Sequence, residues 1–168
     1  NLERLLYHIT NDATKVKSYM EKLQSTGCYQ VDEATLKAIQ ETFSAGYLDD
    51  NATKKCIHDI YQQDNYVADT HTAVAWQVAQ DYQKSTQDKT PMVVLSTASP
   101  YKFSDSVLSA LGEDISDKDE FALLDKLSTL NKDKIPQGLA QLQSLPILHN
   151  NLCAKEDMIK AVNTFLNI

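Results

Sequence analysis

The fold is decided by the stretch Met92-Val93-Val94-Leu95-Ser96-Thr97-Ala98-Ser99-Pro100-Tyr101-Lys102-Phe103. Its first four residues are apolar and two of them are valine, so the pattern predicts a strand that is covered on both faces. Buried strands of this kind belong to α/β layers, where ligands bind at the loops that follow the carboxyl ends of strands. Ser96 and Thr97 stand at that point, and they are therefore the first residues to consider for chemistry.

The composition is that of an ordinary globular protein. The 168 residues are 42% hydrophobic and 23% charged, which is enough apolar material for one buried core, so we expect a single domain spanning residues 1–168. The net charge of −7 and the lack of clustered Lys and Arg disfavour nucleic acid and anionic membranes as partners. Small molecules or proteins are the expected partners.

The cysteines give no sign of a disulfide framework or a zinc site. Cys28, Cys56 and Cys153 are far apart and odd in number, which favours free thiols in a reducing compartment over a catalytic thiol. The sequence shows no signal peptide and no apolar run long enough to span a bilayer, so we expect a cytoplasmic protein. Because Asn1 already lies inside a helical pattern, we also expect the chain to be a piece of a longer protein.

Helical periodicity dominates the rest of the chain, with about nine helices expected. The expected apolar faces carry Leu2, Leu5, Leu6 and Ile9; Val16, Tyr19, Met20 and Leu23; Leu36, Ile39 and Phe43; Cys56, Ile57 and Ile60; Ala73 to Tyr82; Val107, Leu108 and Leu111; Phe121, Leu124 and Leu127; Leu139 and Leu142; and Met158, Ile159, Val162, Phe165 and Leu166. The expected N-caps are Asp12, Asp32, Asp50 or Asn51, one of Asp69, Thr70 and Thr72, Ser104, and Ser116. The polar groups at 49–51 are read as caps rather than calcium ligands, because the alternating oxygen ligands of a calcium loop are absent.

The predicted fold class is α/β: a predominantly helical chain with a small, incomplete sheet. Only the run at 92–95 and a weaker one at 46–49 read as strands, and a buried parallel strand normally has paired neighbours. We therefore expect the missing strands upstream of Asn1.

The residues alone leave the chemistry open. No Gly-rich phosphate loop, paired-cysteine motif or nucleophile elbow is present, and no metal site is expected. The hydroxyls of Ser96 and Thr97 could cap the loop or contact a ligand, and position alone favours the cap. His71 is more readily a structural histidine than a catalytic one. The backbone N–H groups at the start of its helix could also face an anion.

Three segments in order resemble successive signatures of the threonine synthases. They are Asn1-Leu2-Glu3-Arg4-Leu5-Leu6, Asp69-Thr70-His71-Thr72-Ala73-Val74-Ala75 and Leu95-Ser96-Thr97-Ala98-Ser99-Pro100-Tyr101-Lys102-Phe103. The family usually has Asp-Pro-His-Thr-Ala in the second and Ser-Thr-Ala-His-Pro-Ala-Lys-Phe in the third. Thr70, Ser99 and Tyr101 therefore depart from the family pattern.

The resemblance implies the carboxyl-terminal part of the large domain of a fold-type-II enzyme of threonine biosynthesis. Such enzymes use pyridoxal phosphate to convert O-phosphohomoserine and water into threonine and phosphate. It further implies that Thr97 donates a hydrogen bond to the pyridine nitrogen of the cofactor, and that Ser99 replaces a family histidine on the substrate side.

The resemblance also implies that this chain holds no catalytic residue of its own. The family's Schiff-base lysine and Gly-rich cofactor-phosphate loop lie upstream of the motif at Asn1, so the chain alone is expected neither to bind the cofactor nor to turn over substrate. The alternative is a non-catalytic helical module that binds other proteins.

Overall fold

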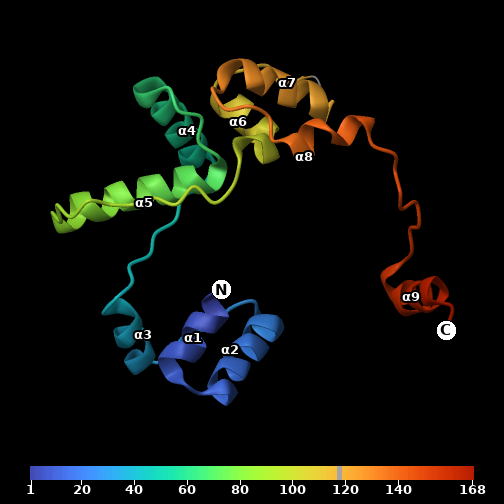
Figure 1. Ribbon diagram of the computed structural model, residues 1–168. Helices are drawn as coiled ribbons and strands as arrows, with labels where there is room; N and C mark the ends of the chain where they lie inside the picture. Colours follow the sequence, from blue (N-terminus) through green and yellow to red (C-terminus); the bar gives the residue numbers. More distant parts are fainter. Residues whose placement is uncertain (117–118) are drawn as a thin grey trace.

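The computed structural model describes residues 1–116 and 119–168, and its chain begins with three helices (Figure 1). They are α1 (Leu2–Thr10), α2 (Ala13–Thr26) and α3 (Glu33–Gln40). Asn11 ends α1 in the left-handed region at φ 48°, and the Asp12 carboxylate then caps α2 by accepting from the backbone N–H of Lys15. Gly27, at φ 77°, ends α2 in the same way, as its lack of a Cβ allows.

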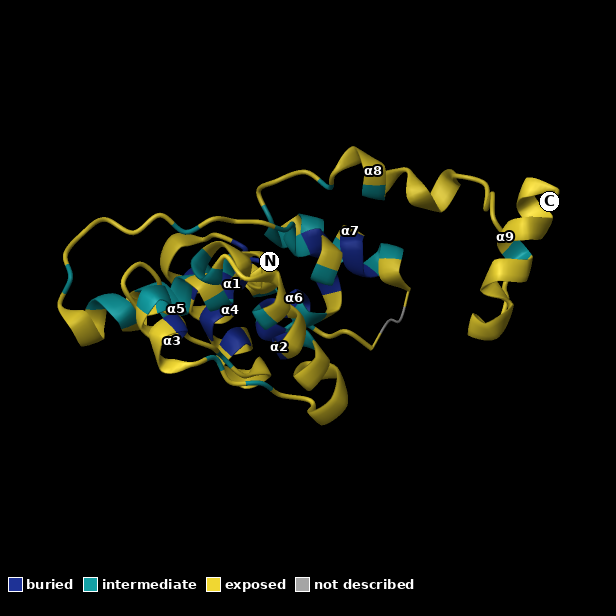
Figure 2. Ribbon diagram, turned by 90° about the horizontal axis from the view of Figure 1, so that it is seen from below, coloured by how far each residue is buried: buried dark blue, intermediate teal, exposed yellow. Residues whose placement is uncertain are grey.

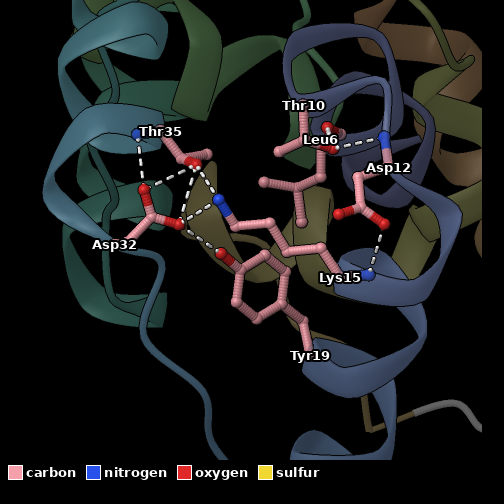
Figure 3. Close-up of polar contacts among 7 residues, drawn as sticks. All are labelled: Leu6, Thr10, Asp12, Lys15, Tyr19, Asp32 and Thr35. Atoms are coloured by element: carbon pink, nitrogen blue, oxygen red, sulfur yellow. Dashed lines mark hydrogen bonds and ion pairs between the residues drawn. The ribbon is translucent and has the colours of Figure 1, made fainter.

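A small core and a polar cluster hold these three helices together. Leu6, Val16 and Tyr19 are buried against one another. The Tyr19 hydroxyl donates to Asp32 Oδ2 at 2.9 Å, and Lys15 donates to Thr35 Oγ1 at 3.1 Å while forming an ion pair with Asp32 (Figure 3). Asp32 also caps α3 by accepting from the backbone N–H of Thr35. The hydrogen bond from Lys15, followed by that from the Thr35 backbone, holds the pKa of Asp32 well below its ordinary value.

The larger core lies in the middle of the chain. It is built by α4 (Asp50–Asp64), α5 (Thr70–Thr86), the 3-10 turn η1 (Pro100–Phe103), α6 (Ser104–Ala110) and α7 (Glu120–Leu130). Helix α4 packs on both α5 and α6, and α6 packs on α7. Ile57, Ala73, Val107, Leu108 and Leu127 are completely buried there. The core therefore fixes the start of α5 and also η1, which is the end of the stretch from Met92 to Phe103.

The carboxyl-terminal segment is largely exposed. It contains α8 (Gln137–Ala140), the 3-10 turns η2 (Leu142–Ser144) and η3 (Lys155–Asp157), and α9 (Met158–Leu166). Helix α9 lies at the end of an extended segment, away from the other helices (Figure 1), and none of its residues is buried (Figure 2). Its predicted apolar face is present but uncovered, with the Phe165 side chain 77% exposed.

The predicted strands are wrong. Among the residues that the structure describes there is no strand, and the segments 92–95 and 46–49 are irregular. Val93 is 85% exposed and Leu95 is 72% exposed, so the apolar run is not buried either. The physical reason is that a strand needs a neighbour to pair its backbone N–H and C=O groups, and the described residues supply none. The helical part of the predicted α/β fold is confirmed, whereas the small sheet is not.

Several predicted caps shift along the chain. Asp49, rather than Asp50 or Asn51, caps α4, and Asp119, rather than Ser116, caps α7. Ser104 is the first residue of α6 and not its cap, because η1 leads directly into the helix.

In the described part of the chain, no helix has the length and apolar character needed to cross a membrane.

Candidate functional site

The site forms around the start of α5, where Asp69 is the N-cap. Its side chain is fully buried, and it accepts from the backbone N–H groups of His71 at 2.9 Å and Thr72 at 3.3 Å. It also accepts from the Thr72 hydroxyl. A buried carboxylate needs such donors to offset its desolvation. Of the three caps predicted for this helix, Asp69 is therefore the one used, and its carboxylate already takes up N–H groups that an anion would need.

The Ser96 hydroxyl joins the predicted ligand loop to this helix start. It lies 3.1 Å from the Thr72 hydroxyl and 3.5 Å from the Tyr66 hydroxyl. Between Pro91 and Ala98, these are the hydrogen bonds that reach other described residues. The loop is therefore tethered to α5 through a single side chain.

Thr97 differs from its neighbour in its environment. Its side chain is exposed, and its hydroxyl makes no hydrogen bond to another described residue. Of the two hydroxyls at the end of the apolar run, one is thus committed to the protein and the other is free. Residue chemistry and position alone could not separate these roles, because both residues carry a hydroxyl at adjacent positions, and only the family resemblance singled out Thr97.

The three departures from the family pattern each have a structural setting. Ser99 is the N-cap of η1, and its hydroxyl accepts from the Tyr101 backbone N–H at 3.4 Å. Tyr101 is 4% exposed, and its hydroxyl donates to the Asp133 carbonyl at 2.6 Å. Burial raises the pKa of Tyr101. Thr70 is the first residue of α5, with its hydroxyl 3.3 Å from His71 Nδ1.

His71 lies on the exposed side of the helix start. Its ring packs at a tilt on Phe103, with 5.1 Å between the ring centroids, and Nδ1 is 3.4 Å from Asp69 Oδ1. The structure therefore brings together residues of the second and third signatures, since His71 and Phe103 lie 32 positions apart in the sequence.

Other groups in the described residues are less suited to chemistry. The cluster around Lys15 and Asp32 satisfies its own charges and hydrogen bonds (Figure 3). Cys56 is buried, its thiol donates to the Ala73 carbonyl at 3.3 Å, and burial raises its pKa, so it is not a reactive thiolate. All three cysteines are free, as predicted. A cleft between α6, α7 and α8 is lined by Tyr101, Phe121 and Leu139 but not by Thr97.

Comparison with known families is decisive for the second half of the chain. Residues 72–162 match the family described as "Threonine synthase, C-terminal". The chain belongs to the threonine synthase family. The resemblance carried by the three motifs is confirmed.

Relatives of the threonine synthase family match most of this chain. Threonine synthase-like 1 from Homo sapiens is 33% identical over 156 residues, which cover 90% of this chain and 19% of the human protein. Threonine synthase from Saccharomyces cerevisiae is 29% identical over 164 residues, covering 86% of this chain and 29% of the yeast protein. The chain therefore spans less than a third of the length of these relatives.

A solved structure of the same family extends the match to the fold. The crystal structure of threonine synthase with bound pyridoxal phosphate from Brucella melitensis aligns with 99% of this chain and 31% of its own, with a TM-score of 0.66 and 29% identity. Both the helical architecture and the sequence thus resemble the carboxyl-terminal region of threonine synthases.

Sequence reasoning named Asp69, Thr72, Ser96 and Thr97 singly but missed the contact between Thr72 and Ser96. The available signal was that the two residues lie in two motifs of one family. Proximity in space is a common reason for such paired motifs, but the residues alone do not give the pairing.

Proposed function

We propose that this chain forms the carboxyl-terminal part of a threonine synthase that uses pyridoxal phosphate. The complete enzyme converts O-phospho-L-homoserine and water into L-threonine and phosphate. The family match and the cofactor-bound relative that aligns with nearly the whole chain support this proposal.

Within that enzyme, Thr97 donates a hydrogen bond to the pyridine nitrogen of the cofactor. The observation that carries this role is the difference between two adjacent hydroxyls: Ser96 is bonded to α5, whereas Thr97 is exposed and makes no bond to the described residues. A free, neutral hydroxyl can donate to an aromatic nitrogen, so the donor at this position fits the group.

The chemical identity of this donor matters. Pyridoxal phosphate, when bound, supplies an electron sink for the carbanionic steps of the reaction. A threonine hydroxyl donates its proton without transferring it, whereas a carboxylate would keep the ring nitrogen protonated. Thr97 therefore orients the ring and leaves its electron-withdrawing strength moderate.

The lysine that binds the cofactor and the loop that binds its phosphate are supplied by residues outside this chain. The chain alone therefore neither binds the cofactor covalently nor releases phosphate from the substrate. Pyridoxal phosphate added to the isolated chain should therefore give no absorbance band of a cofactor linked to a specific lysine. A band that disappears when one lysine is substituted would contradict this.

The test uses the complete reading frame that encodes the chain. The purified product should carry pyridoxal phosphate and release phosphate from O-phosphohomoserine. Thr97→Ser should keep the cofactor absorbance and most of kcat, whereas Thr97→Val should lower kcat on the order of tenfold, the effect of losing one hydrogen bond. Thr97→Asp should shift the absorbance, because a carboxylate holds a proton on the ring nitrogen.

Two outcomes would contradict the proposal. A frame that starts directly before Asn1 and yields a protein without cofactor would favour the helical interaction module. Wild-type absorbance and kcat in Thr97→Val would remove Thr97 from the cofactor site while leaving the family assignment intact.

A further inference from the structure

The hydroxyls of Thr72 and Ser96 have a defined donor direction. Each hydroxyl carries one proton, and the Asp69 carboxylate can only accept. The Thr72 proton therefore points to Asp69, and the 3.1 Å contact between the two hydroxyls is completed by the proton of Ser96. Tyr66 can then donate to Ser96 over its longer distance of 3.5 Å. The protons thus run from Ser96 to Thr72 to Asp69, and the Ser96 hydroxyl has none left to offer a ligand.

The inner end of this chain of hydrogen bonds is firmly anchored. The Asp69 side chain is fully buried and holds three donors. Its neighbours Ala68 and Ala73 are completely buried in the larger core, and Thr72 is buried as well. Displacing Asp69 would therefore require opening the contact of α5 with α4.

The outer end controls the position of Thr97. Ser96 is the residue through which the segment from Pro91 to Ala98 is hydrogen-bonded to other described residues. Thr97 is its direct neighbour, and consecutive Cα atoms are fixed about 3.8 Å apart across a planar trans peptide. Holding Ser96 against α5 therefore limits how far the Thr97 hydroxyl can move.

We propose that Asp69 and Thr72 are positioning residues that act through Ser96 to present the Thr97 hydroxyl to the cofactor ring. This role rests on the proposed function of Thr97. In this arrangement, residues of the second signature hold the residues of the third signature in position.

The first test is the mobility of Thr97 in the complete enzyme, measured as the order parameter of its methyl group by NMR with methyl-labelled threonine. Thr72→Val keeps the shape of the side chain but removes the hydroxyl, and it should lower the Thr97 order parameter. Thr72→Ser should restore it. Ser96→Ala cuts the same link from the exposed loop, so it should reproduce the loss without a risk to folding.

Thr53→Val is the matched control. Thr53 also lies in the first turn of a helix, is buried to a similar degree, and donates to a local backbone carbonyl, that of Asp49, at 2.8 Å. This variant should leave the Thr97 methyl unchanged. Equal effects of Thr53→Val and Thr72→Val would overturn the proposal, as would unchanged mobility of Thr97 in both Thr72→Val and Ser96→Ala.

The second test is kinetic and spectroscopic. Thr72→Val and Ser96→Ala should shift the cofactor absorbance in the same direction as Thr97→Val and lower kcat on the order of tenfold, with KM for O-phosphohomoserine nearly unchanged. If Thr97→Val has these effects and the other two do not, the positioning role is wrong and the proposed function stands. If Thr97→Val itself has no effect, the cofactor contact fails and the positioning role fails with it.

Discussion

The Tyr101 hydroxyl donates to the backbone carbonyl of Asp133 at 2.6 Å, which ties η1 to the segment that follows α7. The ring of Tyr101 is almost fully buried in the larger core. Because the family pattern has a small residue at this position, the tyrosine supplies both apolar area and a hydrogen bond that the pattern lacks. It thereby fixes the end of the loop that carries Thr97.

Replacing Tyr101 with phenylalanine should destabilise the protein by about 1 kcal/mol, because the ring stays buried while one hydrogen bond is lost. The measurement is urea unfolding followed by circular dichroism. Tyr47→Phe is the control, since Tyr47 is exposed and its hydroxyl has no hydrogen-bond partner among the described residues. Equal midpoints for the two variants would show that the bond to Asp133 contributes nothing.

The ion pair between Lys15 and Asp32 predicts a pH dependence for α1 to α3. The pKa of Asp32 lies below its ordinary value of 3.8 in the folded chain, so the folded carboxylate stays ionised where the unfolded one takes up a proton. The stabilising effect of the Asp32 carboxylate is therefore fully present above about pH 3.8 and is lost as the pH falls below that value.

Amide hydrogen exchange in α2 and α3 measures this effect. At pH 6 the Asp32→Asn variant should be less protected than wild type, and the difference should shrink as the pH falls below about 4. The comparison with Asp32→Asn is needed because Asp59 and Asp114 also have lowered pKa values. If the difference in protection between wild type and Asp32→Asn stays constant over this pH range, the ion pair does not cause it.

Gly46 should not tolerate a side chain, although its φ angle is not in the left-handed region. A Cβ at this position would lie 2.9 Å from Val78 Cγ1 and 3.0 Å from Cγ2. Valine is stiff at χ1, so Gly46→Ala should destabilise the contact of the 41–49 segment with α5 by about 1 kcal/mol. The double variant with Val78→Ala should recover part of this loss. Gly138→Ala is the control for a change without steric conflict: no atom lies within 4 Å of its Cβ, and Gly138 lies in α8, where alanine is the better helix former.

The segment between α8 and α9 should be the first site of limited proteolysis. Leu145, Ile147, Leu148 and Leu152 are all exposed, and residues 145–154 are irregular. A protease that cleaves after large apolar residues should release α9 before it cuts α4 or α5, as mass spectrometry of the first fragments would reveal. An initial cut within the larger core would contradict the observed burial.

Local chemistry made much of this fold predictable. Asp12 and Asp32 are predicted as caps, and Asp69 as one of three candidates, because the capping bond reaches only two or three residues along the chain. The same reasoning missed Asp49 by one position, since neighbouring acids compete for a cap. The predicted apolar faces of α3 and α9 carry Leu36 and Phe165, yet both side chains are exposed, because periodicity shows which face is apolar and not what covers it.

The errors and omissions concern contacts between distant residues. The run at 92–95 has the composition of a strand, but pairing depends on a partner that the run itself cannot specify. The link between Thr72 and Ser96 spans 24 positions and depends on how α5 packs. The family resemblance singled out Thr97 as a candidate cofactor contact, and the structure adds that the Ser96 hydroxyl is bonded to Thr72 while the Thr97 hydroxyl makes no bond to a described residue.

The exposed apolar run from Met92 to Leu95 has a consequence for handling the protein. Its backbone makes no hydrogen bond to another described residue, and the side chains of Val93 and Leu95 are exposed to solvent. Such segments can stack with copies of themselves in cross-β assemblies. The isolated chain should therefore aggregate more as its concentration rises, and Val93→Lys should keep it in solution, because a charge in such a segment opposes stacking.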